Sequence, residues 1–177
     1  MILKTKKFNH RTSVSTVLIL ISLVFYALST STLYALECQL DNAALQSMPE
    51  VEIKFELPTG ELLKFSAKLA DNARTRAAGF QRVCASTIEK SPILFVFEHE
   101  SIPRFHMRNV VAPIDIAFIK KGGEIDSIQP MAIYVLASRS RPLYNPRQAV
   151  IAALEVSPGF YSEHGIDENT RVSWVRH

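Results

Sequence analysis

Two acidic residues stand in otherwise apolar stretches and are the first candidates for chemistry. Asp115 lies in P-I-D-I-A-F-I, and Glu155 lies in V-I-A-A-L-E-V. Burying an isolated carboxylate costs several kcal/mol or removes its ionisation, so each acid needs a cation or hydrogen-bond donors if it is buried. On neighbouring strands, the two would supply the acid and base of a glycan hydrolase. Alternatively, both acids are structural. Arginine side chains would then form ion pairs with them, and Asp115 would hold the loop over 109–114 by accepting hydrogen bonds.

A cationic stripe is predicted in the segment R-F-H-M-R-N. If this segment is a strand, Arg104, His106 and Arg108 share one face. Arginine side chains bind carboxylates, phosphates and acidic sugars in bidentate geometry, so the stripe is a candidate ligand surface. The alternative is a solvated strand face. The candidate ligand-binding residues are Arg76, His106, Arg108, Asn109, Asp115 and Glu155.

Other kinds of site find less support in the sequence. His106 and Met107 would point to opposite faces of a strand, so they cannot easily share a copper ion. The sequence has no G-x-S-x-G motif, phosphate loop or dinucleotide fingerprint. We therefore predict a non-catalytic site that holds neither a metal nor a cofactor.

Short strands are the elements expected to position these residues. Alternating apolar residues over 50–57 and 63–69, separated by P-T-G, predict a hairpin. A short helix over 73–78 is expected, with Asp71 or Asn72 as its cap and Gly79 at its end. Further strand signals cover 93–97, 104–110, 114–119, 124–128, 150–156 and 171–175.

These elements indicate the fold class. Seven or eight short strands with one or two short helices predict a mainly β fold, either a compact sandwich or a partly closed barrel. The Gly122-Gly123 pair suits a hairpin turn, because glycine accepts positive φ. We expect a single domain over 50–177, preceded by a lead-in segment over 36–49.

The N-terminal segment has the pattern of an export signal. Basic residues precede an uncharged run over 12–36, and small residues lie near Ala35. This pattern predicts a signal peptide over 1–35, cut after Ala35 or, as second choice, after Ser31. Roughly 20 apolar residues suffice to cross a bilayer, so an uncleaved membrane anchor is the alternative. Export predicts a periplasmic or secreted protein.

The positive charge of the chain belongs to this leader. The formal net charge is +3, and it becomes −1 without residues 1–35, which hold four basic and no acidic residues. A near-neutral body without a Lys/Arg-rich block argues against a nucleic-acid partner. A membrane is expected as partner only through an uncleaved leader.

The two cysteines, Cys38 and Cys84, both lie in the expected mature chain. An oxidising compartment lets a disulfide persist, and a bridge between them would stabilise the fold by roughly 4 kcal/mol on the chain-entropy model. Two unpaired thiols are the alternative. Because the sequence has no C-x-x-C motif, a thiol oxidoreductase is not expected.

Residues from about 51 to 174 resemble the family called domain of unknown function 192 (DUF192), small and often exported bacterial and archaeal proteins. The resemblance rests on R-x-x-G at Arg76 to Gly79, on F-H-M-R-N-V-x-x-P-I-D-I-A-F-I, on a G-x-I hairpin and on L-E-x-x-x-G over 154–159. It implies a compact, mainly β fold and adds no reaction.

The chain departs from the family pattern at three places in these motifs. His106 replaces the usual tryptophan, Val110 the usual threonine and Gln81 the usual methionine. We expect an exported domain that binds an unknown small molecule or envelope polymer, or serves as an accessory envelope protein, near Arg108, Asn109 and Asp115. A glycan-acting hydrolase that uses Asp115 and Glu155 is the alternative.

Overall fold

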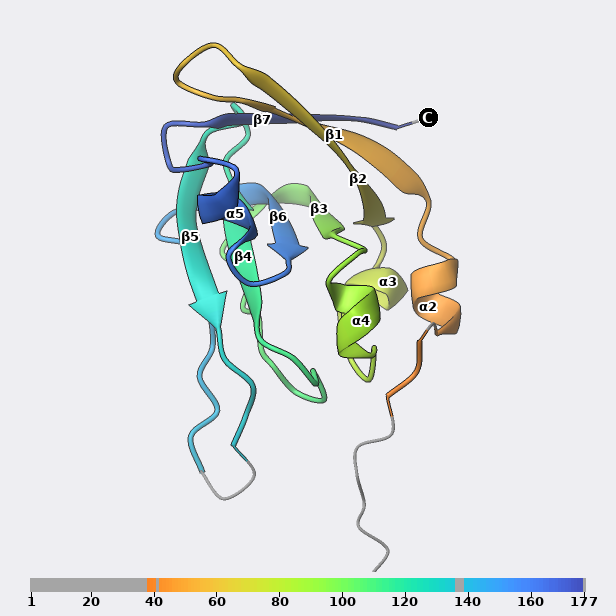
Figure 1. Cartoon of the computed structure of the whole chain (residues 1–177). Helices are drawn as coiled ribbons and strands as arrows, with labels where there is room; N and C mark the ends of the chain where they lie inside the picture. The colour runs from red at the N-terminus through yellow and green to blue at the C-terminus, as the bar shows by residue number, and fades with distance from the viewer. Residues whose placement is uncertain (1–37, 41, 136–138, 177) are drawn as a thin grey trace, which may run out of the picture. The chain divides into compact units, whose positions relative to one another are not determined.

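The computed structural model describes residues 38–40, 42–135 and 139–176. The predicted leader and its cut after Ala35 lie outside this part of the chain. Within it, seven strands form one mixed sheet in the order β5-β4-β6-β3-β2-β1-β7 (Figure 1). The strands are β1 (Glu50–Glu56), β2 (Leu62–Ala70), β3 (Ile93–Ser101), β4 (Ile114–Ile119), β5 (Ile125–Met131), β6 (Val150–Val156) and β7 (Arg171–Arg176).

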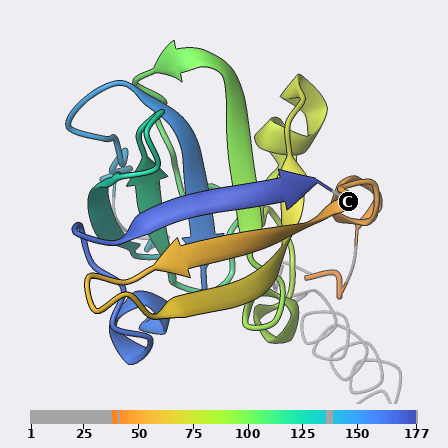
Figure 2. The ribbon, with the colours of Figure 1, turned by 90° about the horizontal axis from the view of Figure 1, so that it is seen from above.

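The sheet is curled but not closed. Strands β2 and β3 pair in parallel, and the other neighbours pair antiparallel. Seen from above, β1, β2 and β7 cross the direction of β3 and β6 (Figure 2). A single bridge between Glu124 and Arg171, with Val172 N–H donating to the Gly123 carbonyl over 2.7 Å, joins the two edges at one point. The predicted mainly β fold is confirmed.

Four short helices accompany the sheet in the described residues, more than the one or two expected. They are α2 (Ala43–Gln46), α3 (Ala73–Ala78), α4 (Ala85–Ile88) and α5 (Phe160–Glu163). The predicted start and end of α3 are confirmed: Asn72 and Thr75 form a capping box, and Gly79 ends the helix with φ +45°. No described helix combines the length and apolar character needed to span a bilayer.

The prediction of a strand over 104–110 is wrong. Only Phe105 makes a β-bridge, to Tyr144, and the chain then turns at Asn109, whose φ is +58°. Alternation could not separate the two outcomes, because Phe105 and Met107 pack against the core while Arg104, His106 and Arg108 are exposed, although the segment is a loop that covers the sheet. Arg104, His106 and Arg108 therefore do not form a strand face.

The sheet separates two apolar clusters. One holds Ile93, Phe95, Ile116 and Phe118 from the sheet and is covered by residues of α2, α4 and the segment 103–110. The other holds Leu94, Ala117, Leu154 and Val156, which alternate with the first set along the strands, and is covered by α5. Both faces of the central strands are consequently buried, so a polar side chain on either face needs a local explanation.

A disulfide joins Cys38 to Cys84, with the Cα atoms 4.8 Å apart. Around it, Gln39 N–H donates to the Arg82 carbonyl over 2.7 Å, and Cys84 N–H donates to the Gln39 carbonyl over 2.9 Å. The bridge thus fastens the lead-in segment to the turn between α3 and α4. The predicted pairing of the two cysteines is present in the structure.

Replacing both cysteines by serine should lower the free energy of unfolding by about 2–4 kcal/mol, because the unfolded chain regains the freedom that the cross-link removes. Urea denaturation at neutral pH measures the change. The wild type in excess dithiothreitol should match the double variant. A loss below about 1 kcal/mol would show that the cross-link hardly stabilises the fold.

Candidate functional site

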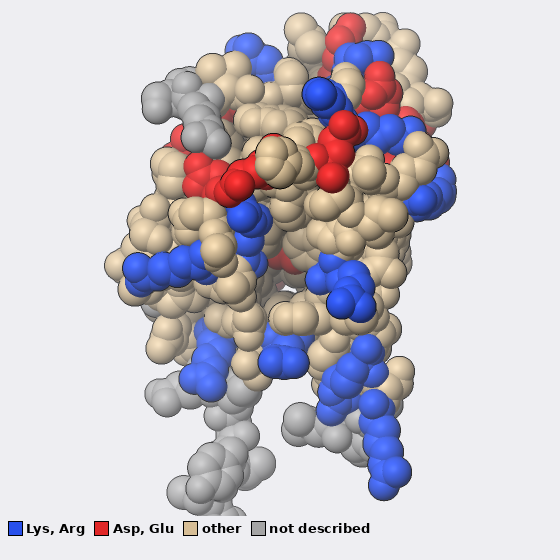
Figure 3. Space-filling view, turned by 180° about the vertical axis from the view of Figure 1, so that it is seen from behind, with Lys and Arg blue, Asp and Glu red and all other residues tan. Residues whose placement is uncertain are grey.

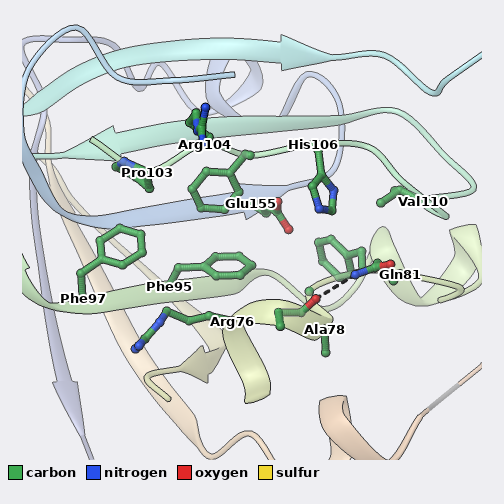
Figure 4. Close-up of a pocket in the computed structure, with 14 residues that line it drawn as sticks. Arg76, Ala78, Gln81, Phe95, Phe97, Pro103, Arg104, His106, Val110 and Glu155 are labelled. Carbon is green, nitrogen blue, oxygen red and sulfur yellow. Dashed lines mark hydrogen bonds between the residues drawn. The ribbon is translucent and has the colours of Figure 1, made fainter. Parts of the chain in front are cut away.

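A pocket of about 310 Å³ opens on the face covered by the segment 103–110. Its lining comes from the end of α3, from β3, from the segment 103–110 and from Glu155 of β6 (Figure 4). Phe95, Phe97 and Phe105 supply aromatic walls. The Phe95 and Phe105 rings meet edge to face, with centroids 5.1 Å apart. The pocket is therefore mainly apolar, with a few polar groups, as small-ligand sites usually are.

Glu155 is the acidic residue of this lining, and it is buried. Strand register sets it between Ile93 of β3 and Ile116 of β4, both fully buried, and leaves Glu155 only 5% exposed. Burial raises the pKa of its carboxyl from 4.5 to about 8, because an apolar setting disfavours the charged form. The described residues offer this carboxyl neither a hydrogen bond nor an ion pair. It faces the pocket as a neutral acid at pH 7.

The end of α3 shapes the pocket beside Glu155. A Cβ atom on Gly79 would lie 3.8 Å from Glu155 Oε2 and 3.5 Å from Phe95 Cζ, so a side chain there would narrow the floor. The positive φ of Gly79 also favours glycine. One turn earlier, Arg76 lines the pocket, and its Nη1 donates to the Val96 carbonyl over 3.0 Å, with the guanidinium directed away from Glu155 (Figure 4).

Hydrogen bonds fix the segment 103–110 over the pocket. Phe105 and Tyr144 exchange two backbone bonds of 2.9 and 3.0 Å. At the other end, Arg82 N–H donates to the Asn109 carbonyl over 2.7 Å, and the Asn109 amide donates to Gln81 Oε1 over 3.3 Å. Asn109 thus ties this segment to the turn after α3 and stays outside the lining.

His106 enters the lining from the same segment. Its Nδ1 accepts the Arg108 N–H over 3.4 Å, which places the proton of the neutral ring on Nε2. The Arg108 side chain is exposed and does not line the pocket. Of the six predicted site residues, the structure brings Arg76, His106 and Glu155 together, and leaves Arg108, Asn109 and Asp115 elsewhere.

Asp115 has a different position from the one expected of a ligand contact. It pairs with Val156 in the sheet, whereas Glu155 pairs with Ile116, so the side chains of Asp115 and Glu155 project from opposite faces. Asp115 Oδ2 accepts the Gly159 N–H over 2.8 Å and fixes the turn between β6 and α5. The paired-carboxylate hypothesis is corrected by this register, since the two acids cannot flank one bond.

Sequence reasoning missed several lining residues. Arg104 was singled out only as part of a strand face, and Gln81 only as a departure from the family pattern. Phe95 and Phe97 read as ordinary strand residues in I-L-F-V-F. Their spacing of two along one strand was the available signal, because it puts both rings on the face that Glu155 shares.

Both kinds of charge lie around this site. The space-filling view shows a hollow with acidic atoms inside it, Lys and Arg side chains beside and below it, and Asp and Glu side chains above it (Figure 3). Arg76 and Arg104 are the arginines among the lining residues. The part of the chain that the structure describes contains no group of three His, Cys, Asp or Glu side chains able to hold a metal ion.

The raised pKa of Glu155 has a consequence for stability. Folded Glu155 keeps its proton up to about pH 8, whereas the unfolded residue loses it near 4.5, so its stabilising contribution is complete below pH 4.5 and is lost as pH rises through 8. Between these two pH values, the free energy of unfolding should fall by up to about 1.4 kcal/mol for each pH unit.

Glu155→Gln should remove this slope, because glutamine does not ionise. Urea unfolding of both proteins from pH 5 to pH 9 measures the difference, and ¹³C NMR of the Glu155 carboxyl gives its pKa directly. A pKa below 6, or an unchanged slope in the variant, would contradict this assignment.

Asp115→Ala should lower the free energy of unfolding by about 1.5–3 kcal/mol, because it removes a charged hydrogen-bond acceptor from the Gly159 N–H. Asp115→Asn keeps an acceptor oxygen and should lose less. Equal losses in the two variants would show that the hydrogen bond is not what makes Asp115 stabilising.

Two solved structures and one protein family are similar to this chain. No curated protein matches the chain. The structure of a candidate transcription regulator from Sinorhizobium meliloti 1021 is 22% identical with a TM-score of 0.60, over 72% of this chain and 95% of that one. A protein of unknown function from Novosphingobium aromaticivorans DSM 12444 is 22% identical with a TM-score of 0.59, over 77% of this chain and 99% of that one.

At this identity the two neighbours show the fold alone. Residues 55–174, more than half of the sequence, match DUF192, a family described as "Uncharacterized ACR". The chain belongs to the DUF192 family.

Proposed function

We propose that this chain is an exported domain that binds a small ligand in the pocket above Glu155 and leaves it chemically unchanged. The observation that carries the proposal is the buried Glu155 carboxyl, which faces the pocket and has no partner among the described residues. Its oxygens are reached from the pocket, because no fully enclosed side-chain oxygen of the described residues lacks a hydrogen-bond partner. A ligand that bonds to them offsets part of the cost of burying this residue.

The other buried acid in the described part of the chain offers a comparison. Asp126 is 4% exposed, and its Oδ2 accepts the Arg147 N–H over 2.7 Å and the Ser127 hydroxyl over 3.3 Å. This fold thus supplies donors where an acid serves the structure. Glu155 lacks them and opens to a pocket, which favours a binding role for it.

Binding is favoured over glycan hydrolysis because the pocket lining contains one acid. Hydrolysis of a glycosidic bond generally uses two carboxylates that flank the bond, and Asp115 projects from the other face of the sheet. Export is part of the proposal and is supported by the leader pattern and by the Cys38–Cys84 disulfide, a bond that persists in oxidising compartments.

The pocket size limits the ligand. Liquid water takes about 30 Å³ per molecule, so 310 Å³ corresponds to on the order of ten non-hydrogen atoms. We therefore favour a small molecule over the envelope polymer.

Ligand-observed NMR with acidic, basic, zwitterionic and neutral probes of roughly six to twelve non-hydrogen atoms tests the proposal. Some probes should bind the wild type and lose binding in Ala78→Phe, which adds a ring to the pocket lining. Ala73→Phe adds the same ring at an exposed position of α3 outside the lining and should bind like the wild type. Absence of any probe that distinguishes the two variants would refute a ligand site here.

A further inference from the structure

We infer that the chain binds anionic lipid bilayers through the loop between β5 and β6, whose apolar side chains enter the lipid layer while its arginines contact lipid phosphates. This contact goes beyond the proposed ligand site and does not use the leader. The described part of the loop tip consists of two arms, residues 132–135 and 139–144, which we call the β5–β6 arms. Figure 1 shows them side by side, running beyond the end of β5.

Tyrosine side chains hold the two arms together. The Tyr134 hydroxyl donates to the Pro142 carbonyl over 3.0 Å, and the Ala132 N–H donates to the Tyr144 hydroxyl over 3.1 Å. Tyr144 also exchanges backbone hydrogen bonds with Phe105, which packs against the core. These contacts attach the β5–β6 arms to the domain and determine which of their side chains face outward.

The side chains that face outward include a group of apolar ones. Ile133 is 45% exposed, Val135 63% and Leu143 49%, so the arms carry three of the seven large apolar side chains that are exposed in the described residues. Single exposed apolar residues are ordinary on a protein surface, whereas a group of them marks a surface that contacts another molecule or a membrane. The β5–β6 arms are therefore a candidate docking surface.

The charge of the arms selects what docks there. The sequence has no acidic residue between Asp126 and Glu155, whereas Arg139 and Arg141 are both exposed on the second arm. The Arg141 guanidinium lies over the Tyr134 ring, 5.1 Å from its centroid. Arginine and tyrosine beside aliphatic side chains suit the headgroup layer, where the charge reaches phosphate and the carbon stem stays with the apolar residues. Anionic lipids therefore complement this surface.

A bilayer fits the β5–β6 arms better than a protein partner does. A specific protein interface buries about 800 Å² on each partner, and three partly exposed aliphatic side chains on two short arms do not supply such an area. A bilayer accepts a few inserted side chains, and each arginine near an anionic surface adds about fivefold in affinity. Below the hollow, Figure 3 shows Lys and Arg but no Asp or Glu side chains among the described residues of that face.

Cosedimentation of the intact chain with lipid vesicles tests the inference. Vesicles of phosphatidylcholine with about one third phosphatidylglycerol should bind at least about tenfold more tightly than vesicles of phosphatidylcholine alone, because of the two arginines. Binding should weaken as the salt concentration rises to about 0.5 M, since salt screens exposed charges. Equal binding to the two kinds of vesicle would overturn the inference.

Two matched double variants assign the charge effect to the arms. Arg139→Gln/Arg141→Gln should bind the anionic vesicles about tenfold more weakly than the wild type. Lys120→Gln/Lys121→Gln removes two charges at the other end of β4 and β5 and should stay within about twofold of the wild type. All forms carry the same N-terminus, so an uncleaved leader contributes equally, and thermal unfolding checks that each is folded. Equal losses in the two double variants would contradict a role for the arms.

A tryptophan on the arms reports insertion directly. The fluorescence of Leu143→Trp should shift to the blue with anionic vesicles and should be quenched by brominated acyl chains, because the ring enters the apolar layer. Leu62→Trp is the matched control, since Leu62 is 62% exposed at the start of β2, and its added ring should show neither change. Both variants keep the native Trp174. If Leu143→Trp responds no more than Leu62→Trp, the arms do not enter the bilayer.

This inference and the proposed ligand site fail separately. Ala78→Phe changes the pocket lining, which contains no residue of the β5–β6 arms, and should bind anionic vesicles like the wild type. Loss of vesicle binding in Ala78→Phe would contradict the assignment of this binding to the arms. The small-ligand probes and the tryptophan reporters therefore test two different surfaces.

Discussion

The burial of Glu155 is the constraint on which the arrangement of this domain depends. Strand β6 is hydrogen-bonded on both sides, by β3 and β4, so residue 155 has no edge through which to reach solvent. Its two sheet neighbours, Ile93 and Ile116, are both fully buried. The carboxyl therefore stays neutral at pH 7, and the pocket over it is the opening through which a partner can arrive.

The two faces of the sheet differ in what their acidic side chains contact. On the face opposite the pocket, Asp115 Oδ2 accepts the Gly159 N–H, and the Tyr161 hydroxyl donates to the Leu154 carbonyl over 2.7 Å. Both bonds lie on the face of the sheet opposite the pocket, and they tie the end of β6 and the turn after it to β4 and α5. They hold Leu154 and Gly159 on either side of Glu155 along the chain, so the opposite face fixes the orientation of the pocket floor.

Much of the fold could be predicted from local patterns. Each of these patterns depends on residues that are close together in the sequence. They are the alternation in the first hairpin, the capping residues of α3 and the Gly122-Gly123 turn. The loop over 104–110 could not be predicted, because Phe105 and Met107 satisfy the alternation of a strand while packing on the sheet from above. Local spacing does not say which surface an apolar residue covers.

The site was predictable only in part for a related reason. Glu155 was identified because a carboxylate in an apolar strand is unusual, and Arg76 because it opens an R-x-x-G motif. Asp115 has the same local signature as Glu155. The difference between them is the register of β4 against β6, which depends on residues 40 positions apart and decides the face of each side chain.

The wall that carries Arg76 and Gly79 is held at its far end by the disulfide. Gly79 is followed by the turn over 80–84, which ends at Cys84, and Arg82 in this turn bonds to both Asn109 and Gln39. Restricting this wall lowers the entropy lost when a ligand is fixed against it. The disulfide therefore contributes to the shape of the pocket as well as to stability, because it holds the turn that follows Gly79.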